Sequence, residues 1–209
     1  MPDDIPWYEA DLIALDLEGT GAQDRENEAI LEIALVPIVG GEPRVDQAYE
    51  TLLNPGRHVP QRPWISPGLT NDALAAAPKL ADVATEITSR INGRYLVGHN
   101  INVDWRLLHR HLPEAVPPGF VDTLRLARHL RPDDKNRGLS IVLERLDLTE
   151  AVTRQVPGGC PHRALWDTVA AATLLSSLLQ GESLTLTELL QVSSPGPAGN
   201  RPPEPTLWD

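Results

Sequence analysis

Two carboxylates stand together near the start of the chain, directly after an apolar run. Residues 12–21 read LIALDLEGTG, and Asp16 and Glu18 are separated by one residue. Side chains in a strand alternate between its two faces, so both carboxylates point the same way. At about 4 Å and an effective dielectric constant near 20, their repulsion costs about 4 kcal/mol. Such a pair is tolerable when one acid is protonated or when a cation such as Mg²⁺ lies between them.

For an isolated D-x-E pattern, a strand that ends in a solvated acidic turn is the better interpretation, so the metal hypothesis needs further acids. Residues 97–108 (VGHNINVDWRLL) supply one candidate, Asp104. A short apolar strand leads into a turn with His99 and Asn100, and Asp104 follows in the first turn of a helix whose apolar face carries Trp105. Ligands bind at such strand ends in α/β sheets. The alternative is an acid that merely stabilises the helix N-terminus.

A third candidate lies in residues 158–167, which read GGCPHRALWD. His162 is expected at a helix start, and Asp167 lies roughly 140° further around that helix. The two can serve one site only if Asp167 projects from the helix body and His162 reaches in from its end. A histidine placed so is suited to be a general base near neutral pH. The alternative is a capping histidine beside an exposed acid. Cys160 lacks an orienting group and an oxyanion hole, which argues against a thiol nucleophile.

The elements needed to position these residues are those of an α/β domain. Three strands joined by short turns predict an antiparallel meander, and the alternation of strands and helices that follows predicts a mixed sheet. The expected strands are residues 11–18, 29–38, 44–53, 95–98 and 120–123. The expected helices are residues 71–77, 81–92, 101–112, a helix from 123 to Leu130, 138–146 and 162–180, with a further short helix at 184–192.

Length and composition bound the function classes. The 209 residues predict a single domain, preceded by a lead-in at residues 1–8, spanning residues 9–180 and followed by a Pro-rich, disordered tail at 181–209. A net charge of −11 argues against sequence-blind adhesion to duplex nucleic acid but not against a small metal site that acts on a chain end. No apolar run is long enough to span a membrane, and a single cysteine suggests a reducing cytoplasm.

The three motifs DLEGTG, GHNINVD and HRALWD, in this order, resemble those of the DnaQ-like family, the DEDDh class of 3′–5′ exonucleases. This family includes the epsilon proofreading subunit of bacterial DNA polymerase III and ribonuclease T. The resemblance covers roughly residues 9–180 and is extended by ISPGLTNDAL, VDTLRLAR and GLSIVLERLDL. It implies a ribonuclease H-like fold with a mixed five-stranded sheet, a meander plus parallel strands, flanked by helices.

Carried over position by position, the resemblance implies functions for individual residues. The implied metal ligands are Asp16, Glu18, Asp104 and Asp167, and the implied general base is His162. The implied substrate contacts are Gly19, Thr20, Asn100 and Val103, and Asp122 is implied as a supporting acid. The family pattern differs at Gly19 (often threonine), Val103 (often phenylalanine) and Pro67 (histidine in some relatives), which affects substrate preference.

Two function classes follow. The first is a metal-dependent exonuclease that uses two Mg²⁺ or Mn²⁺ ions to release 5′-mononucleotides from single-stranded 3′ ends. The acidic composition favours DNA over RNA, and proofreading, repair and RNA trimming stay open. The second is a catalytically silent binding module that docks on a polymerase or repair complex through the tail. A silent module would usually have lost one of the motif residues, which favours the enzyme. A homodimer is left open by the sequence.

Overall fold

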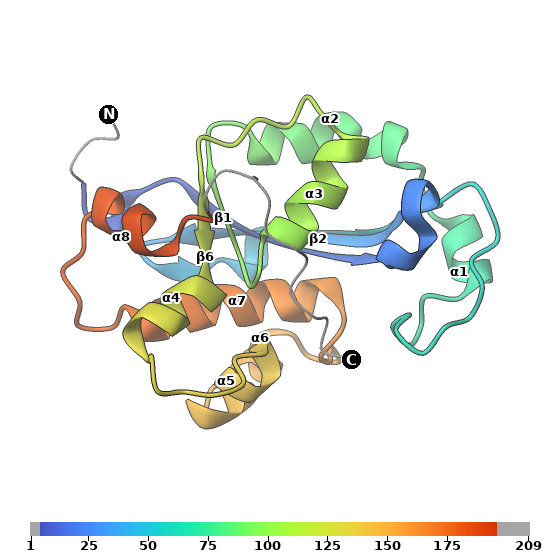
Figure 1. Cartoon of the computed structure of the whole chain (residues 1–209). Coiled ribbons are helices and arrows are strands. Elements are labelled where there is room, and N and C mark those ends of the chain that lie inside the picture. The colour runs from blue at the N-terminus through green and yellow to red at the C-terminus, as the bar shows by residue number, and fades with distance from the viewer. Residues whose placement is uncertain (1–4, 196–209) are drawn as a thin grey trace.

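The structure, a computed structural model, describes residues 5–195. It places one mixed sheet between two layers of helices (Figure 1). The strands are β1 (Leu12–Gly19), β2 (Ile30–Val39), β3 (Glu42–Pro43), β4 (Tyr49–Leu52), β5 (Tyr95–Gly98) and β6 (Phe120–Asp122). The helices are α1 (Asn71–Ala76), α2 (Leu80–Ile91), α3 (Asn102–His111), α4 (Thr123–Leu130), α5 (Leu139–Arg145), α6 (Thr149–Gln155), α7 (Ala164–Leu178) and α8 (Leu186–Ser193).

The sheet has the order β3-β2-β1-β5-β6, with β4 also paired to β2. Strand β1 is antiparallel to β2 and parallel to β5, which is in turn parallel to β6. This is the predicted mixed sheet of the ribonuclease H-like fold. Of the third strand expected at 44–53, only β4 forms, because Val45–Gln47 is a 3-10 turn. The two-residue β3 precedes this turn and pairs with the end of β2.

Alternation along β1 assigns its two faces. Ile13 and Leu15 pack with α2 and α3 on one side of the sheet, whereas Leu12 and Ala14 pack on the α7 side. Because side chains alternate with period 2, Asp16 continues the row that faces α7, and Glu18 follows it at the end of the strand. The apolar residues of β1 thus fix the direction in which the carboxylates point.

Helix boundaries differ from the expected ones mainly around the third motif. Helix α7 begins at Ala164, two residues later than predicted, so that His162 lies in the loop before it. The sequence analysis also did not predict α6, whose Val152 is buried against α7. A short helix with few apolar residues gives little periodic signal, and tertiary packing supplies the rest of its stability.

The fold continues past Gln180. Leu186 and Leu189 of α8 are buried beside β6 and the N-terminal Trp7, whose backbone N–H donates to the Leu184 carbonyl at 3.2 Å. The hydroxyl of Ser194 donates to the carbonyl of Phe120 in β6 at 2.8 Å. The short helix expected after Gln180 is therefore part of the folded domain, and the rest of the predicted tail, residues 196–209, lies outside the described residues. None of the helices between residues 5 and 195 is long and apolar enough to cross a membrane.

Truncating Leu189 tests whether α8 is integral to the core. The side chain is fully buried, so we expect Leu189→Ala to lower the free energy of unfolding by about 2–5 kcal/mol. Gln191→Ala, on the exposed side of the same helix, should leave it nearly unchanged. The measurement is urea denaturation of both variants in EDTA. Equal stability of the two variants would contradict a structural role for α8.

Candidate active site

Three carboxylates from distant parts of the sequence meet at the end of β1. Asp16, Glu18 and Asp167 each offer an oxygen atom, and these oxygens all lie within 4.8 Å of one another. Asp16 and Glu18 come from the strand, and Asp167 comes from the first turn of α7, which crosses the same face of the sheet. The structure thus brings together residues that are about 150 positions apart in the chain.

Asp104 reaches this group from α3, which packs on the face of the sheet opposite α7. It lies in the first turn of α3, and its Oδ1 accepts a hydrogen bond from the backbone N–H of Leu17 at 3.2 Å. Leu17 lies between Asp16 and Glu18, so Asp104 is tied to the strand at the centre of the acid pair. All four predicted metal ligands therefore gather at one place, although Asp104 is outside the tight group of three.

The crowding of these half-buried acids raises their pKa values. Loss of hydration is the largest cause for each, and repulsion from neighbouring carboxylates adds to it. The pKa of Asp16 is raised well above its ordinary value, first by burial and then by Asp104 and Asp167. Burial raises the pKa of Glu18 to about 8, against a hydrogen bond from Ser66 that lowers it. Burial likewise raises the pKa values of Asp104 and Asp167 to about 7.

This donor set fits a divalent cation. Carboxylate oxygens are the ligands that Mg²⁺ and Mn²⁺ prefer, and Mg²⁺ binds them at about 2.0–2.1 Å. Oxygens within 4.8 Å of one another can approach a common ion with small side-chain movements. A cation would also favour the ionised form of these acids, against the burial and the mutual repulsion that raise their pKa values. The acidic residues of the described chain are therefore consistent with a metal site at the end of β1.

His162 is placed beside this cluster by its backbone. Its N–H donates to Oδ2 of Asp167 at 3.0 Å, and its side chain is exposed. Its φ is +65°, in the left-handed region that non-glycine residues rarely adopt. The residue thus lies next to a predicted metal ligand, in a strained turn just before α7.

Three polar residues at the site were not predicted from the sequence. Ser66, in the Pro-rich segment before α1, donates its hydroxyl to Oε2 of Glu18 at 2.8 Å. Glu32 of β2 is fully buried opposite Glu18 and is paired with Arg163 at 2.6 Å. A glutamate within the apolar run AILEIALV is a visible signal that could have identified Glu32. Nothing in the local sequence distinguishes Ser66.

The predicted substrate contacts fall into two groups. Val103 is 54% exposed on α3, directly before Asp104, and Asn100 lies in the preceding turn with φ +65°. Thr20 is buried, and its hydroxyl accepts the backbone N–H of Ala29 at 3.0 Å. That hydroxyl therefore closes the loop after β1 instead of facing solvent. A Cβ at Gly19 would lie 3.2 Å from the Ala29 carbonyl, so close packing explains the glycine.

The second motif is braced by its polar residues. Asp122 accepts hydrogen bonds at 2.9 Å from the N–H groups of Asn100 and Leu124, which fixes the turn before α3 and caps α4. Burial lowers the pKa of His99 to about 4, so the ring is neutral, and its Nε2 donates to the Arg137 carbonyl at 2.7 Å. Asp122 and His99 therefore support the site without being ligands.

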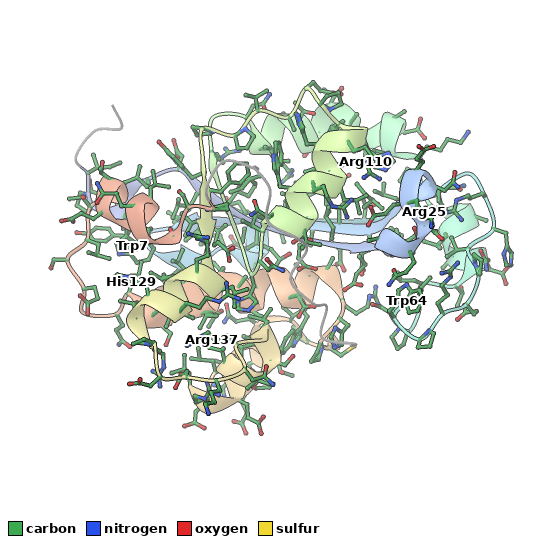
Figure 2. All side chains as sticks on the ribbon, in the orientation of Figure 1. Trp7, Arg25, Trp64, Arg110, His129 and Arg137 are labelled. Atoms are coloured by element: carbon green, nitrogen blue, oxygen red, sulfur yellow. The ribbon has the colours of Figure 1, made fainter. Side chains whose placement is uncertain are left out.

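Hydrogen bonds hold the loop that follows β1 in place. The indole N–H of Trp64 donates to the Thr20 carbonyl at 3.1 Å, and Arg110 donates to the Arg25 carbonyl at 3.1 Å. Figure 2 shows Trp64, Arg25 and Arg110 at the same end of the molecule, opposite Trp7. Arg106 also holds the buried Glu28 with bonds of 2.7 and 2.8 Å. The loop that follows the acid pair is thus tied to both α3 and the Pro-rich segment.

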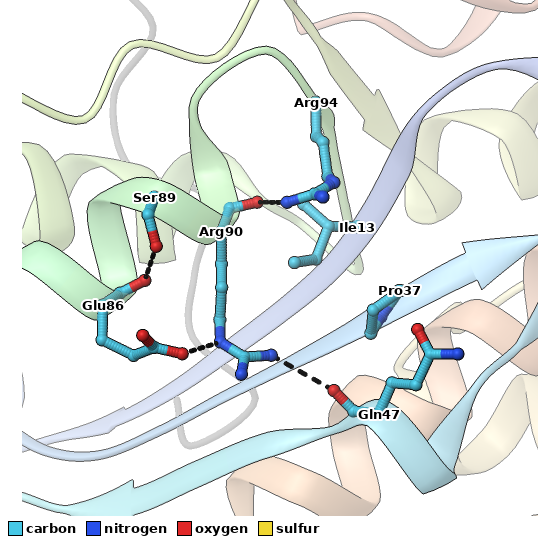
Figure 3. Close-up of a pocket in the computed structure, with 7 residues that line it drawn as sticks. All are labelled: Ile13, Pro37, Gln47, Glu86, Ser89, Arg90 and Arg94. Atoms are coloured by element: carbon cyan, nitrogen blue, oxygen red, sulfur yellow. Dashed lines mark hydrogen bonds and ion pairs between the residues drawn. The ribbon is translucent and has the colours of Figure 1, made fainter.

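A surface cavity of about 390 Å³ lies elsewhere, between α2 and the strands (Figure 3). Ile13 and Pro37 line it near the start of β1 and the end of β2, far along the strands from the acid pair. Its arginines are already engaged, because Arg90 contacts Glu86 at 2.6 Å and Arg94 donates to the Arg90 carbonyl at 2.7 Å. None of the predicted site residues lines this cavity.

Comparisons with known proteins identify the family and agree with the fold. A family model described as "Exonuclease" (RNase_T) matches residues 13–175. The PolC-type DNA polymerase III of Oceanobacillus iheyensis is 32% identical over 83% of this chain, which spans 12% of that relative. The DNA polymerase III subunit epsilon of Aquifex aeolicus is 27% identical over 80% of both chains. A solved structure of exonuclease X in complex with 5′ overhanging duplex DNA is 26% identical, with a TM-score of 0.65, and covers 87% of this chain and 98% of that one.

The raised pKa values predict how pH affects the metal-free protein. Between about pH 5 and 8 the folded protein retains protons on Glu18, Asp104 and Asp167 that the unfolded chain has lost. Stability should therefore fall as pH rises through this window, by on the order of 5 °C in Tm. Added Mg²⁺ or Mn²⁺ should reverse the loss, because it binds the deprotonated acids.

Thermal melts at a series of pH values, with EDTA or with Mn²⁺, make this measurement. Asp16→Asn removes one of the crowded charges and should flatten the fall in EDTA. Asp133→Asn, at an exposed acid outside the cluster, should not. A Tm in EDTA that rises between pH 5 and 8 would contradict the assignment of raised pKa values.

Proposed function

This chain belongs to the DnaQ-like family of 3′–5′ exonucleases, and we propose that it removes 5′-mononucleotides from single-stranded 3′ ends, with DNA preferred over RNA. The observation that carries the proposal is the convergence of Asp16, Glu18 and Asp167 at one strand end, with Asp104 beside them. The described residues thus retain a full set of acids, which supports an active enzyme over a silent binding module.

In the proposed mechanism, Asp16, Glu18, Asp104 and Asp167 would hold two divalent cations. When bound, such cations lower the pKa of a water molecule and offset charge on the phosphate and the departing oxygen. His162 accepts the proton of the attacking water, and its exposed position before α7 leaves the ring able to reach that water. Ser66 keeps the Glu18 carboxylate oriented through its 2.8 Å hydrogen bond.

The substrate would enter past the exposed α3 residue Val103, which offers an apolar surface to the terminal base. Terminal bases have to be splayed to reach the acids, and this favours single-stranded ends. The relatives named as DNA polymerase III subunits, together with the DNA in the exonuclease X structure, support DNA as the substrate. A polymerase or repair partner that docks through the tail, a homodimer and a cytoplasmic location stay predictions.

Replacing His162 tests the proposed general base. We expect His162→Ala to lower kcat by about 10²–10⁴-fold, because it removes a proton acceptor but no metal ligand. Binding of Mn²⁺, measured by calorimetry, should stay within about threefold of the wild-type value, since the acids remain. His129→Ala, an exposed histidine on α4 (Figure 2), is the control and should leave kcat unchanged. Normal turnover by His162→Ala would contradict the role of general base assigned to this residue.

Matched DNA and RNA oligomers of one sequence test the substrate class. With a 5′ label, 3′–5′ hydrolysis should give a descending ladder in Mg²⁺ or Mn²⁺ and no ladder in EDTA. The DNA ladder should descend faster, and a recessed 3′ end in a duplex should be shortened more slowly than a free strand. Faster hydrolysis of RNA would overturn the DNA preference, and release without metal would overturn the mechanism.

A further inference from the structure

An ion pair between the buried Glu32 and the partly exposed Arg163 lies beside the acid cluster and is not used by the proposed chemistry. Glu32 of β2 is 0% exposed, and Arg163 donates to it through Nε at 3.0 and 3.1 Å and through Nη2 at 2.6 Å. The backbone N–H of Ala164 donates to the same carboxylate at 3.1 Å. Three donors from two consecutive residues therefore converge on one side chain of a neighbouring strand.

This pair is costly for the fold. Glu32 lies directly opposite Glu18 in the antiparallel pairing of β1 and β2, and like charges in that position repel. Burying the Glu32 carboxylate costs several kcal/mol in lost hydration, so an apolar residue is often at least as stabilising. Next along the same face of β2 are Ala34, Val36 and Ile38, all buried apolar residues. Packing alone would be served by another apolar residue at position 32.

The pair fixes the start of α7. Arg163 is the N-cap residue of this helix and makes no cap of its own, while Ala164 has a backbone N–H that lacks a partner within the helix. Glu32 satisfies that N–H from outside, where a negative charge is also favoured by the helix dipole. The carbonyl of Arg163 accepts the N–H of Asp167 at 3.0 Å. The helix start is thereby held against β2 rather than free to fray.

His162 is connected to the start of α7 through Arg163 and through Asp167. It directly precedes Arg163, and its own N–H donates to the Asp167 carboxylate at 3.0 Å. Its left-handed φ of +65° is unfavourable for a residue with a Cβ and persists only where the surroundings impose it. The anchored Arg163 and the Asp167 carboxylate impose it here.

We infer that Glu32 and Arg163 are a positioning pair that holds His162 beside Asp167 for the proton transfer. The inference rests on the proposed function for its catalytic consequence, but the held conformation of His162 is a property of the protein alone. Neither residue touches substrate in this assignment. Arg163 acts through the backbone of His162, and Glu32 acts through Arg163.

Conservative substitutions in the metal-loaded enzyme test the pair. Arg163→Lys keeps the charge but loses the planar fork, so we expect kcat to fall about 10–100-fold with KM within about threefold. In a His162→Ala background the same change should lower kcat less than about twofold, because the residue it positions is gone. An equal fall in both backgrounds would overturn the inference. Arg44→Lys removes a matched two-bond contact with Asp46 on the exposed β3–β4 turn and should change nothing.

Amide hydrogen exchange at His162 gives a second measurement that needs no catalysis. In the metal-free protein, Arg163→Lys and Glu32→Gln should each speed exchange at this amide about tenfold or more, while core amides of β1 stay protected. Unchanged exchange would overturn the inference. If Arg163→Lys fails to fold cooperatively, Glu32→Gln alone decides, because it retains the shape of the side chain. If the wild-type protein shows no nuclease activity, the proposed function fails and the exchange result still decides whether the pair holds His162.

Discussion

The structure depends on one electrostatic constraint, the mutual repulsion of acids gathered at the end of β1. The packing of each strand or helix determines where its acid lies. The apolar face of β1 directs Asp16 toward α7, and the crossing of α7 over the sheet delivers Asp167. Such a cluster is held together by the fold and not by its own interactions. Part of the free energy of core packing therefore offsets the repulsion between these carboxylates.

Backbone N–H groups reduce this cost without adding cations. Leu17 donates to Asp104, and His162 donates to Asp167, so that each acid outside β1 is oriented by a dipole of the main chain. Arg163 lies next to this group, but its guanidinium is directed to Glu32 rather than to the predicted ligands. Asp16, Glu18 and Asp167 each still offer an oxygen atom to a shared divalent ion.

The sequence predicted the sheet and the acid pair for reasons that are local. Alternation placed Asp16 and Glu18 on one face, and the strand signals predicted an antiparallel meander within a mixed sheet. The remaining acids could not be derived this way, because Asp104 and Asp167 are each compatible with an ordinary helix start; only the family resemblance assigned them. Ser66 and Arg163 act across 48 and 131 positions of the chain, and no local pattern encodes such contacts. The 3-10 turn that shortens the third strand was likewise not predicted, and α6 depends on tertiary packing against α7.

The position of α8 has a consequence for the edge of the sheet formed by β6. Strand β6 ends the sheet on that side, and an unprotected edge strand offers N–H and C=O groups on which another chain can assemble. Ser194 occupies the Phe120 carbonyl, and Leu186 and Leu189 bury the neighbouring apolar surface. The segment after the last motif thus covers part of this edge, and we expect a fragment that ends at Gln180 to expose it and to aggregate more readily than the longer chain.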